Sequence, residues 1–508
     1  MPALLLENGA VRTLDPRAPL AGELAVDDAL IAAKPAPDAR HIDLRGACVV
    51  PGLADAHVHF PTWSLGLRQA RLDGARSLAE ALERVAQALD HVAPGGWLRG
   101  LGWRDGDWTE RPTRAALDRV APKVPVALMS KDYHSLWLNS AALAHAGAEL
   151  DVPGGVVERD ENGEPLGVLR ERAAWEFRDR YVRPSVDEML DGCREGVRVA
   201  AARGVTAVHD KDGWLGAFEV WERLLEDGEL TLRVWQSFPW DRLDELSALG
   251  LRSGFGNDLL RMGYLKGFMD GTLGSATARL LDGSGVEITT REELEEVVRL
   301  AARAQWPVAV HAIGDAANRS ALDAFEASRG EWEPRGLRQR IEHAQLLDAG
   351  DVSRFGGIGV AASVQFSHAP SDRDLADRLW EGRDGAYAYR SLLDAGARLA
   401  NGSDAPVEEL DPLAGVVAGA LRTLDERPAW RPEQAVTVEE AFAAVCVAPA
   451  WLEHQEHRRG RLRPGMLADL AVLDRDPFAC EPEELPHVRV LATMLGGSWT
   501  YAAPDGPI

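Results

Sequence analysis

The sequence predicts an α/β protein: a TIM-like (β/α)8 barrel with an insertion after its first strand, plus a small β-sandwich domain formed by both chain termini. Three observations lead to this prediction. Eight short apolar runs have the length of buried strands, and helical patterns fill most of the gaps between them. The gap after the first run is far too long for a single helical crossover. Both chain ends consist of short alternating runs separated by Gly, Pro and Asp turns.

The barrel is predicted to span residues 51–459. Thr290 and Glu293 have capping-box spacing before apolar residues at helical intervals, which predicts a helix between the fourth and fifth runs. Strands that alternate with helices in this way run parallel, and eight of them close into a barrel. The expected strands lie within residues 52–59, 204–210, 230–238, 260–271, 306–315, 338–345, 357–368 and 397–407.

Two further parts complete the predicted architecture. An inserted subdomain is expected at about residues 62–200, with a strand within 124–134 and a hairpin that turns at Asn162 and Gly163. The chain ends form the other part. Neither end has enough strands for a stable sheet pair. We therefore expect one composite β-sandwich domain from residues 1–50 and 460–508.

Composition excludes several classes of function. The chain has 508 residues and a formal net charge of −24, which argues against binding to nucleic acid or to an anionic membrane. No signal peptide or run of eighteen apolar residues is visible, so the cytoplasm is the expected location. The four cysteines are far apart and indicate neither a disulfide framework nor a thiolate metal site.

Polar side chains gather at the ends of the predicted barrel strands. His57 and His59 are two residues apart, so they point to the same side at the carboxyl end of the first strand, where such barrels keep their active sites. Taken alone, such a pair is more often two hydrogen-bonded core histidines. Other strand ends carry further groups of metal-binding type, one of them a lysine that is costly to bury unpaired: Lys266, His311, His343 and Asp404. Together the six side chains predict a metal site on one rim.

These motifs make the chain resemble the amidohydrolase superfamily of metal-dependent hydrolases, and most of all its family 3 branch, which includes N-substituted formamide deformylases. The likeness extends from about residue 45 to 475. The matching segments, in chain order, are VVPGLADAHVH, VPVALMSKDYHSLWLNSAAL, GVTAVHD, LKGFMDGTLGS, HAIGD, IEHAQ, GSDAPV and GRLRPGMLADLAVLD.

The resemblance implies a role for each residue of the first metal site. His57 and His59 would bind the more buried ion. Asp404 would complete that site and would act as the proton shuttle for an attacking water.

The same resemblance implies a second metal position. Lys266 would be carboxylated on its amine by carbon dioxide and would bridge the two positions, while His311 and His343 would hold the second ion. Imidazole and oxygen ligands suit zinc, although iron, manganese or nickel can compete for them. One or two ions fit the pattern.

The activity implied is hydrolysis of a non-peptide C–N bond, of amide or N-formyl type, in a small-molecule substrate. A same-scaffold alternative is a hydrolase of esters or cyclic amides, or a deaminase. An alternative of another class is a catalytically inactive binding protein, which loss of ligands would mark; here every ligand is present. Relatives are commonly dimers, so a homodimer is compatible with the resemblance.

Within the insertion, two residues are candidate substrate contacts. His134 matches a family segment and is a candidate catalytic contact for the substrate or oxyanion; the alternative is a structural histidine near Trp137. Asn139 is expected to cap the helix that follows. Trp103, one of several tryptophans in this region, is a candidate for binding a hydrophobic or aromatic substrate group, although core packing is the simpler explanation for most of these tryptophans.

Within the barrel, three more residues are candidate substrate contacts. Asp270 is expected to pair with Arg279 or to line the pocket. The branch usually has an arginine where this chain has Ala276, so Arg279 either substitutes for it or the substrate differs. His368 follows the seventh strand and is expected to face the pocket.

Overall fold

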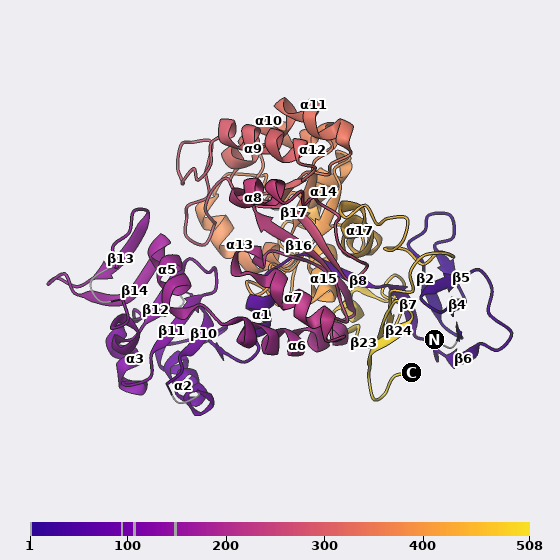
Figure 1. The fold of residues 1–508 in the computed structure, drawn as a ribbon, viewed down its shortest axis with the longest axis horizontal. Helices are drawn as coiled ribbons and strands as arrows, with labels where there is room; N and C mark the ends of the chain where they lie inside the picture. The colour runs from indigo at the N-terminus through magenta and orange to yellow at the C-terminus, as the bar shows by residue number, and fades with distance from the viewer. Residues whose placement is uncertain (1–2, 93–94, 105–107, 147–149) are drawn as a thin grey trace. The chain divides into compact units, whose positions relative to one another are not determined.

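The structure is a computed structural model that describes every residue except 1–2, 93–94, 105–107 and 147–149 (Figure 1). The chain divides into two compact units, each with hydrophobic cores of its own. The first unit comprises Met1–Phe60 and Arg194–Ile508, and the second comprises Pro61–Cys193. Two helices, α1 (Phe60–Gly66) and α6 (Val186–Ala202), span the limits between them.

The first unit contains an eight-stranded parallel sheet. Its ring is completed by a parallel bridge between Val58 and Ala405 and by the hydrogen bond from Asp404 N to His57 O, 2.7 Å. Every strand overlaps its predicted range, so the prediction of an eight-stranded parallel barrel is confirmed. The strands, in their order around the ring, are β8 (Leu53–Val58), β15 (Val205–Asp210), β16 (Arg233–Pro239), β17 (Leu260–Phe268), β18 (Val308–Ala312), β19 (Arg340–His343), β20 (Ala361–Val364) and β21 (Leu399–Asn401).

Helices lie in the connections between these strands. In α9 the predicted capping box forms, because the Thr290 side chain accepts from Glu293 N while the Glu293 carboxylate accepts from Thr290 N. The buried side chains of that helix recur at helical spacing and face the sheet. The helices of this unit are α7 (Ala217–Glu226), α8 (Leu243–Ala248), α9 (Arg291–Arg303), α10 (Asp315–Ala327), α11 (Arg329–Trp332), α12 (Ala349–Ile358), α13 (His368–Leu379), α14 (Tyr389–Asp394), α15 (Pro412–Leu421), α16 (Val438–Phe442) and α17 (Ala448–Leu452).

Both chain ends contribute strands to the same sheet. A six-stranded sheet has the order β24-β23-β22-β7-β2-β3, and in it Val49 of β7 pairs with Val472 of β22. A four-stranded sheet, β5-β4-β1-β6, shares one buried core with it. The strands are β1 (Leu4–Glu7), β2 (Ala10–Arg12), β3 (Leu20–Ala21), β4 (Leu24–Asp27), β5 (Leu30–Ala32), β6 (Arg40–Asp43), β7 (Cys48–Pro51), β22 (Leu470–Leu473), β23 (Val490–Leu495) and β24 (Ser498–Ala502). A separate β-sandwich domain stays a prediction, because these sheets belong to the same compact unit as the barrel.

The second unit is built on a mixed six-stranded sheet, β13-β14-β12-β11-β10-β9. The hairpin predicted from Asn162 and Gly163 forms, with Asp160 accepting from Asn162 N and Glu164 N at the turn. Asn139 caps the following helix, as expected, by accepting from Ala142 N. The elements are β9 (Ala70–Arg71), α2 (Leu78–Ala88), β10 (Leu98–Trp103), α3 (Arg114–Val120), β11 (Val126–Ser130), β12 (Ser135–Leu138), α4 (Ser140–Leu143), β13 (Gly155–Arg159), β14 (Pro165–Glu171) and α5 (Arg172–Phe177).

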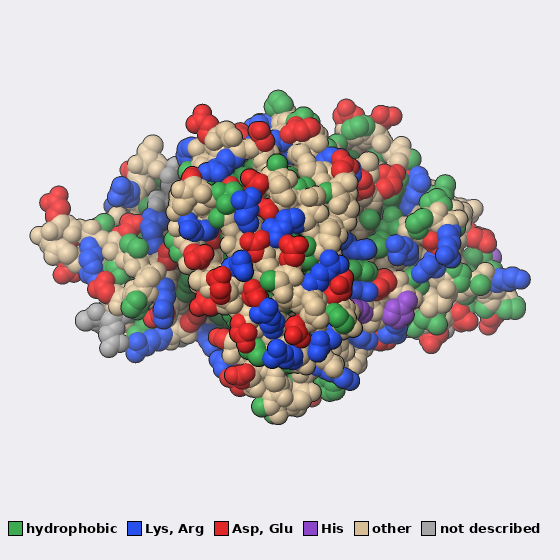
Figure 2. All heavy atoms as spheres, turned by 90° about the horizontal axis from the view of Figure 1, so that it is seen from above, with side chains coloured by type: hydrophobic (Ala, Val, Ile, Leu, Met, Phe, Trp, Pro, Cys, Tyr) green, Lys and Arg blue, Asp and Glu red, His purple; other side chains and the backbone are tan. Residues whose placement is uncertain are grey.

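The surface and the helices bear on possible partners. On the face drawn in Figure 2, lysine and arginine side chains are interspersed with aspartate and glutamate. None of the helices in the described part of the chain is both long enough and apolar enough to cross a membrane.

Candidate metal centre

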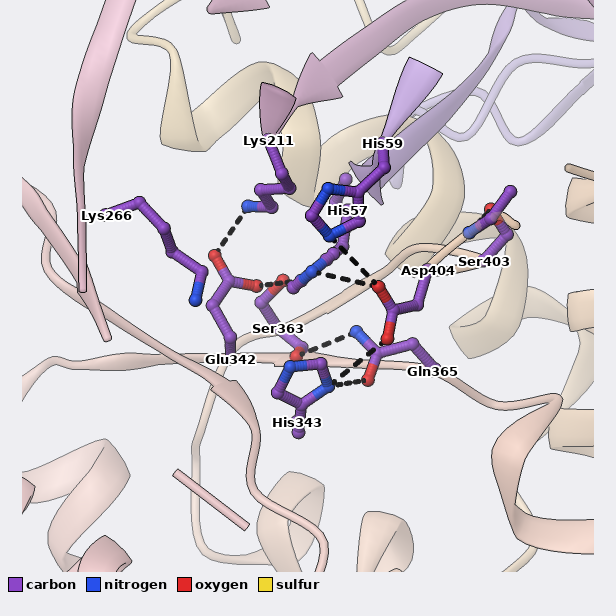
Figure 3. Close-up of polar contacts among 12 residues, drawn as sticks. His57, His59, Lys211, Lys266, Glu342, His343, Ser363, Gln365, Ser403 and Asp404 are labelled. Carbon is purple, nitrogen blue, oxygen red and sulfur yellow. Dashed lines mark hydrogen bonds and ion pairs between the residues drawn. The ribbon is translucent and has the colours of Figure 1, made fainter. Parts of the chain in front are cut away.

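The barrel brings together several of the side chains that the sequence singles out. His57 lies near the end of β8 and His343 at the end of β19, while His59 and Asp404 follow the ends of β8 and β21. Figure 3 shows these four side chains pointing toward one another. Because all parallel strands of a barrel end on the same rim, residues almost 350 positions apart in the chain meet here.

Asp404 lies between two pairs of imidazoles. Its Oδ1 is 3.3 Å from His57 Nε2 and 3.7 Å from His59 Nε2. Its Oδ2 is 3.9 Å from His343 Nδ1 and 3.9 Å from His368 Nε2. Both trios, His57–His59–Asp404 and His343–His368–Asp404, have ligand atoms close enough to hold an ion. Ligand atoms bound at zinc distances in a tetrahedral site are about 3.4 Å apart, so the first trio fits a divalent cation well.

The backbone at this rim is unusual in a way that places the ligands. Asp404 has φ 57 and His343 has φ 76, in the left-handed region that costs non-glycine residues energy. Asp404 is held there because its N–H bonds to His57 O and the preceding Ser403 N–H bonds to the Asp55 carboxylate. A Cβ at Gly402 would lie 2.3 Å from His57 N, so only glycine allows this close approach. The GSD segment is therefore explained by its contact with β8.

Buried carboxylates orient the first pair of imidazoles. His57 Nδ1–H donates to Glu342 Oε2 at 2.7 Å, and His59 Nδ1–H donates to Asp212 Oδ1 at 2.8 Å. A carboxylate only accepts, so the proton of each neutral ring is on Nδ1 and each Nε2 keeps its lone pair. This is the usual arrangement around metal-binding histidines, because the outer carboxylate fixes the ring and makes it a stronger ligand.

Amide side chains orient the second pair. The Gln365 Oε1 atom accepts from His343 Nδ1–H at 2.8 Å. His368 is the first residue of α13, and Gln345 Nε2 donates to its Nδ1 at 3.1 Å. The His368 Nε2 atom is buried and has no hydrogen-bond partner among the residues the structure describes. A buried polar atom of this kind indicates that something else binds in front of it.

Charge and burial have opposite effects on the pKa of Asp404. Burial alone would raise the pKa of Asp404, but the imidazoles of His57, His343 and His368 hold that pKa well below its ordinary value. Asp404 is therefore ionised at neutral pH. Burial and the charge of Lys211 lower the pKa of His57, which favours the neutral ring that binds metals.

Lys266 is buried near the same rim, and its amine end points to the space beside Glu342 and His343 (Figure 3). Its Nζ donates to Gly267 O at 3.2 Å and lies 3.8 Å from the centre of the Phe268 ring. Within the described residues it forms no salt bridge. Burial lowers the pKa of Lys266 to about 8, although the charges of Glu342 and Asp404 oppose that effect. Its bridging role stays a prediction.

His311 lies beside this centre. Its ring centre is 4.5 Å from that of His343, and its Nε2 donates to Gly271 O at 2.9 Å. A metal would therefore have to use its Nδ1. The prediction that His311 and His343 hold the second ion remains, with His368 as a further group on that side.

The structure describes the contacts of two candidate substrate residues in the barrel, Asp270 and Arg279. Asp270 does not pair with the Arg279 side chain: its carboxylate accepts from the backbone N–H groups of Arg279, Ile313 and Gly314. Asp270 thus fixes the loops around the rim, and burial raises its pKa to about 7 despite these bonds. The Arg279 guanidinium donates to Ser284 O within its own loop at 3.3 Å, and its role toward the substrate stays a prediction.

The second unit contains the other two candidates. Trp103 is fully buried and its Nε1 donates to Leu128 O. It is therefore a core residue, as the alternative interpretation expects, and not a substrate contact. His134 donates from Nδ1 to Glu171 Oε2 at 2.7 Å and its ring meets the edge of Trp175 rather than Trp137. Its role toward the substrate stays a prediction.

Sequence reasoning missed residues that surround the ligands. Lys211, Asp212, Glu342 and Gln365 all contact a ligand or a ligand's partner. A signal existed for two of them. Lys211 follows directly on the second strand, and Glu342 is a charge within a predicted barrel strand, where burial is costly unless a partner is near.

An eight-stranded parallel barrel with imidazoles and an ionised carboxylate converging on its carboxyl rim defines the class of metal-dependent barrel hydrolases. The family model for the amidohydrolase family (Amidohydro_3) matches residues 40–501. The chain therefore belongs to the amidohydrolase family, which confirms the resemblance seen in its motifs.

Similar proteins cover nearly the whole chain. Protein LONG AFTER FAR-RED 3 from Arabidopsis thaliana is 32% identical over 98% of this chain and 91% of its own length. N-substituted formamide deformylase from Arthrobacter pascens is 28% identical over 98% of each chain. The solved structure of an uncharacterized metal-dependent hydrolase from Pyrococcus furiosus has a TM-score of 0.76 and 27% identity, covering 94% of this chain and 100% of its own.

Proposed function

We propose that this hydrolase cleaves a non-peptide C–N bond, of amide or N-formyl type, in a small molecule. The observation that carries the proposal is the position of Asp404: one carboxylate oxygen faces His57 and His59, and the other faces His343 and His368. An ionised carboxylate in that position has a ligand side and a reaction side. The similarity to an N-substituted formamide deformylase supports the choice of bond.

The donors present suit a divalent cation. His57, His59 and Asp404 would hold the first ion, and their spacing and their imidazole and carboxylate donors favour zinc. His311 and His343 would hold a second, with His368 adjacent. A bound cation would supply positive charge that polarises a carbonyl group and makes a water molecule more acidic.

Lys266 is proposed to be carboxylated. Its neutral amine would attack carbon dioxide, forming an N–C bond and releasing one proton, so that the neutral amine becomes an anionic carbamate. The lowered pKa of about 8 increases the fraction of neutral amine near neutral pH. The lack of a salt-bridge partner among the described residues supports this conversion, because a buried ammonium would otherwise remain uncompensated.

Asp404 is proposed to move the proton. It enters the reaction ionised, accepts a proton from the attacking water, and later gives that proton to the leaving nitrogen. Attack turns the planar carbonyl carbon tetrahedral and places negative charge on its oxygen. His368 is suited to stabilise that charge, because Nδ1 accepts from Gln345 and the neutral ring therefore carries its proton on the unpartnered Nε2.

The rim also has a feature that suits an apolar substituent. Phe268, the last residue of β17, leaves 47% of its surface exposed, and its ring centre lies 5.3 Å from that of His311. A hydrophobic or aromatic group next to the scissile bond would gain by covering this ring. Phe268 thus takes the role that the sequence analysis assigns to Trp103.

The test is a substrate screen with zinc-loaded protein. N-formyl and N-acyl amines, aromatic ones included, would be compared with matched esters, cyclic amides and amino-substituted rings. We expect the formyl or acyl amines to be hydrolysed, and activity to be lost on chelation and regained with zinc. If the protein prefers esters, cyclic amides or amino-substituted rings, the proposed amide or N-formyl bond is wrong and the preferred class takes its place. Full zinc loading with no hydrolysis of any compound would favour a binding protein.

A further inference from the structure

We propose that Lys211 and Glu342 are positioning residues that hold the His57 imidazole in the orientation that binds metal. Lys211 then serves as the hydrogen-bond donor that anchors Glu342, and its amine is not a site of carboxylation. The proposal rests on the proposed function in two respects: a metal ion binds His57, and Lys266 is the lysine that is carboxylated. Neither residue belongs to the ligand set, and both side chains are fully buried.

The two carboxylate oxygens of Glu342 contact different groups. Its Oε2 accepts from His57 Nδ1 at 2.7 Å. Its Oε1 accepts from Lys211 Nζ at 2.7 Å and lies 2.9 Å from Arg340 Nε. With both oxygens engaged, the carboxylate cannot rotate without breaking charged hydrogen bonds in the protein interior. His57 therefore has one fixed acceptor on Nδ1, and its Nε2 is aimed at Asp404 (Figure 3).

Lys211 differs from Lys266 in what surrounds its amine. Lys211 Nζ donates to Glu342 and to the Tyr264 hydroxyl at 2.6 Å, and it lies 4.4 Å from the Tyr264 ring centre. Its amine is engaged there by a carboxylate, a hydroxyl and an aromatic face, while burial and the charge of Arg340 hold its pKa well below the ordinary value. Lys266 donates only to a neighbouring carbonyl within the described residues. Of the two buried strand-end lysines, Lys211 is thus engaged by three groups, whereas the amine of Lys266 is available for chemistry.

The network continues away from the rim, and this extension provides a control. Arg340 Nη1 donates to His209 Nδ1 at 2.8 Å, so His209 keeps its proton on Nε2, which donates to Glu453 Oε1 at 2.8 Å. Glu453 also pairs with Arg459. Glu453 is as deeply embedded in the network as Glu342, yet it touches neither a ligand nor Lys211 in the contacts described.

The first experiment measures metal binding and needs no substrate. Zinc affinity of metal-free protein would be determined by competition with a chromophoric chelator, and the absorption spectrum of the cobalt(II) form would report ligand geometry. Glu342→Gln should weaken zinc binding roughly 10- to 100-fold and Lys211→Met about tenfold, as outer partners of metal-binding histidines do. The control Glu453→Gln should keep the parent affinity and cobalt spectrum. Parent values in the first two variants, or an equal loss in the control, would overturn the proposal.

The second experiment separates the two lysines. Protein equilibrated with 13C-bicarbonate would be examined by 13C NMR for a carbamate signal. Lys211→Met should retain the signal and Lys266→Met should lose it, whereas the reverse pattern would overturn the role given to Lys211. Failure of the proposed function looks different: zinc binding and the variants behave as described, but no substrate is turned over.

A third measurement uses the unaltered protein, in case a variant does not fold. In zinc-loaded protein labelled with 15N-histidine, the His57 signal is identified by its absence in His57→Gln. The proposal requires a proton on His57 Nδ1, hydrogen-bonded to Glu342. A proton on Nε2 would contradict it whatever the variants do.

Discussion

The two oxygens of Asp404 face sides of the site that are built differently. On the Oδ1 side the imidazoles of His57 and His59 lie 3.3 and 3.7 Å away, and each is anchored by a buried carboxylate. On the Oδ2 side both imidazole atoms are 3.9 Å away and both rings are anchored by neutral amides. Carboxylate anchors make stronger ligands than amide anchors do. This difference predicts that the Oδ1 side binds a metal ion more tightly than the Oδ2 side does.

The largest effect on turnover is expected from Asp404, the residue that faces both sides. Asp404→Asn keeps the shape and the imidazoles, so most of the metal should remain bound, but the proton acceptor is lost. Turnover should fall by about 10³- to 10⁴-fold, near the upper range for general acid–base catalysis. Steady-state rates on the best substrate, together with metal content, provide the measurement. Hydrolysis at the parent rate would show that Asp404 is not the proton shuttle.

Removing one imidazole from each side tests the asymmetry directly. His57→Asn should weaken the tightest zinc site by more than about 100-fold, because a ligand is lost and Glu342 Oε2 is left without its donor. His343→Asn should leave that tight site within about tenfold of the parent. Chelator competition on the two variants makes the comparison. Equal losses would mean that the two sides do not differ in the way their anchors suggest.

His368 should affect the reaction rather than the metal. His368→Gln removes the unpartnered Nε2 next to Asp404, and kcat should fall about 100-fold, as for loss of one oxyanion donor. Zinc content and the cobalt spectrum should not change. If the metal content falls instead, His368 is a ligand and the Oδ2 side is a second metal site of ordinary strength.

Lowering the pH should weaken zinc binding on the Oδ1 side, because His59 becomes protonated. Burial lowers the pKa of His59, but the charges of Asp212 and Asp404 outweigh it and the pKa is raised, whereas that of His57 is lowered. In metal-free protein His59 therefore keeps its proton to higher pH, and the ion must displace that proton. Below the raised pKa, zinc affinity should drop about tenfold per pH unit. Competition titrations between about pH 5.5 and 8, on either side of the ordinary histidine pKa, measure the slope, and a flat profile would contradict it.

The smallest effect is expected from Phe268, and it should appear in KM alone. Phe268→Ala should raise KM for an aromatic substrate several-fold, as expected when about 1 kcal/mol of apolar contact is lost, with kcat unchanged. Phe255→Ala is the matched control, because Phe255 is also exposed but lies between α8 and β17, away from the carboxyl rim. Equal KM values for Phe268→Ala and the parent would remove Phe268 from the substrate site.

The strand ends are predictable because burial and periodicity act locally. An apolar run that ends in a histidine or aspartate places that residue on the rim whatever the neighbouring strands do, so the sequence alone identifies His57, His59, His343 and Asp404. The eight strands follow from the same signal. His368 is expected to face the pocket, and its unpartnered Nε2 supports that expectation.

The remaining residues depend on geometry that the sequence does not display. His343 follows Glu342 directly, and simple alternation would send them to opposite faces, but the left-handed backbone at His343 lets both serve the site. Arg279 lies in a loop whose path is decided by three N–H groups converging on Asp270. Trp103 is in the core because its indole finds an acceptor at Leu128 O, a pairing between strands that composition cannot reveal.

The hydrogen bond from Asp404 N to His57 O joins the first and last strands of the barrel, so the seam of the ring and the catalytic centre are one structure. A ribosome must make more than 400 residues before that seam can close. A chain that ends before this point lacks the carboxylate that is proposed to complete the first metal site. If that proposal holds, only chains that have closed the ring bind an ion at full strength.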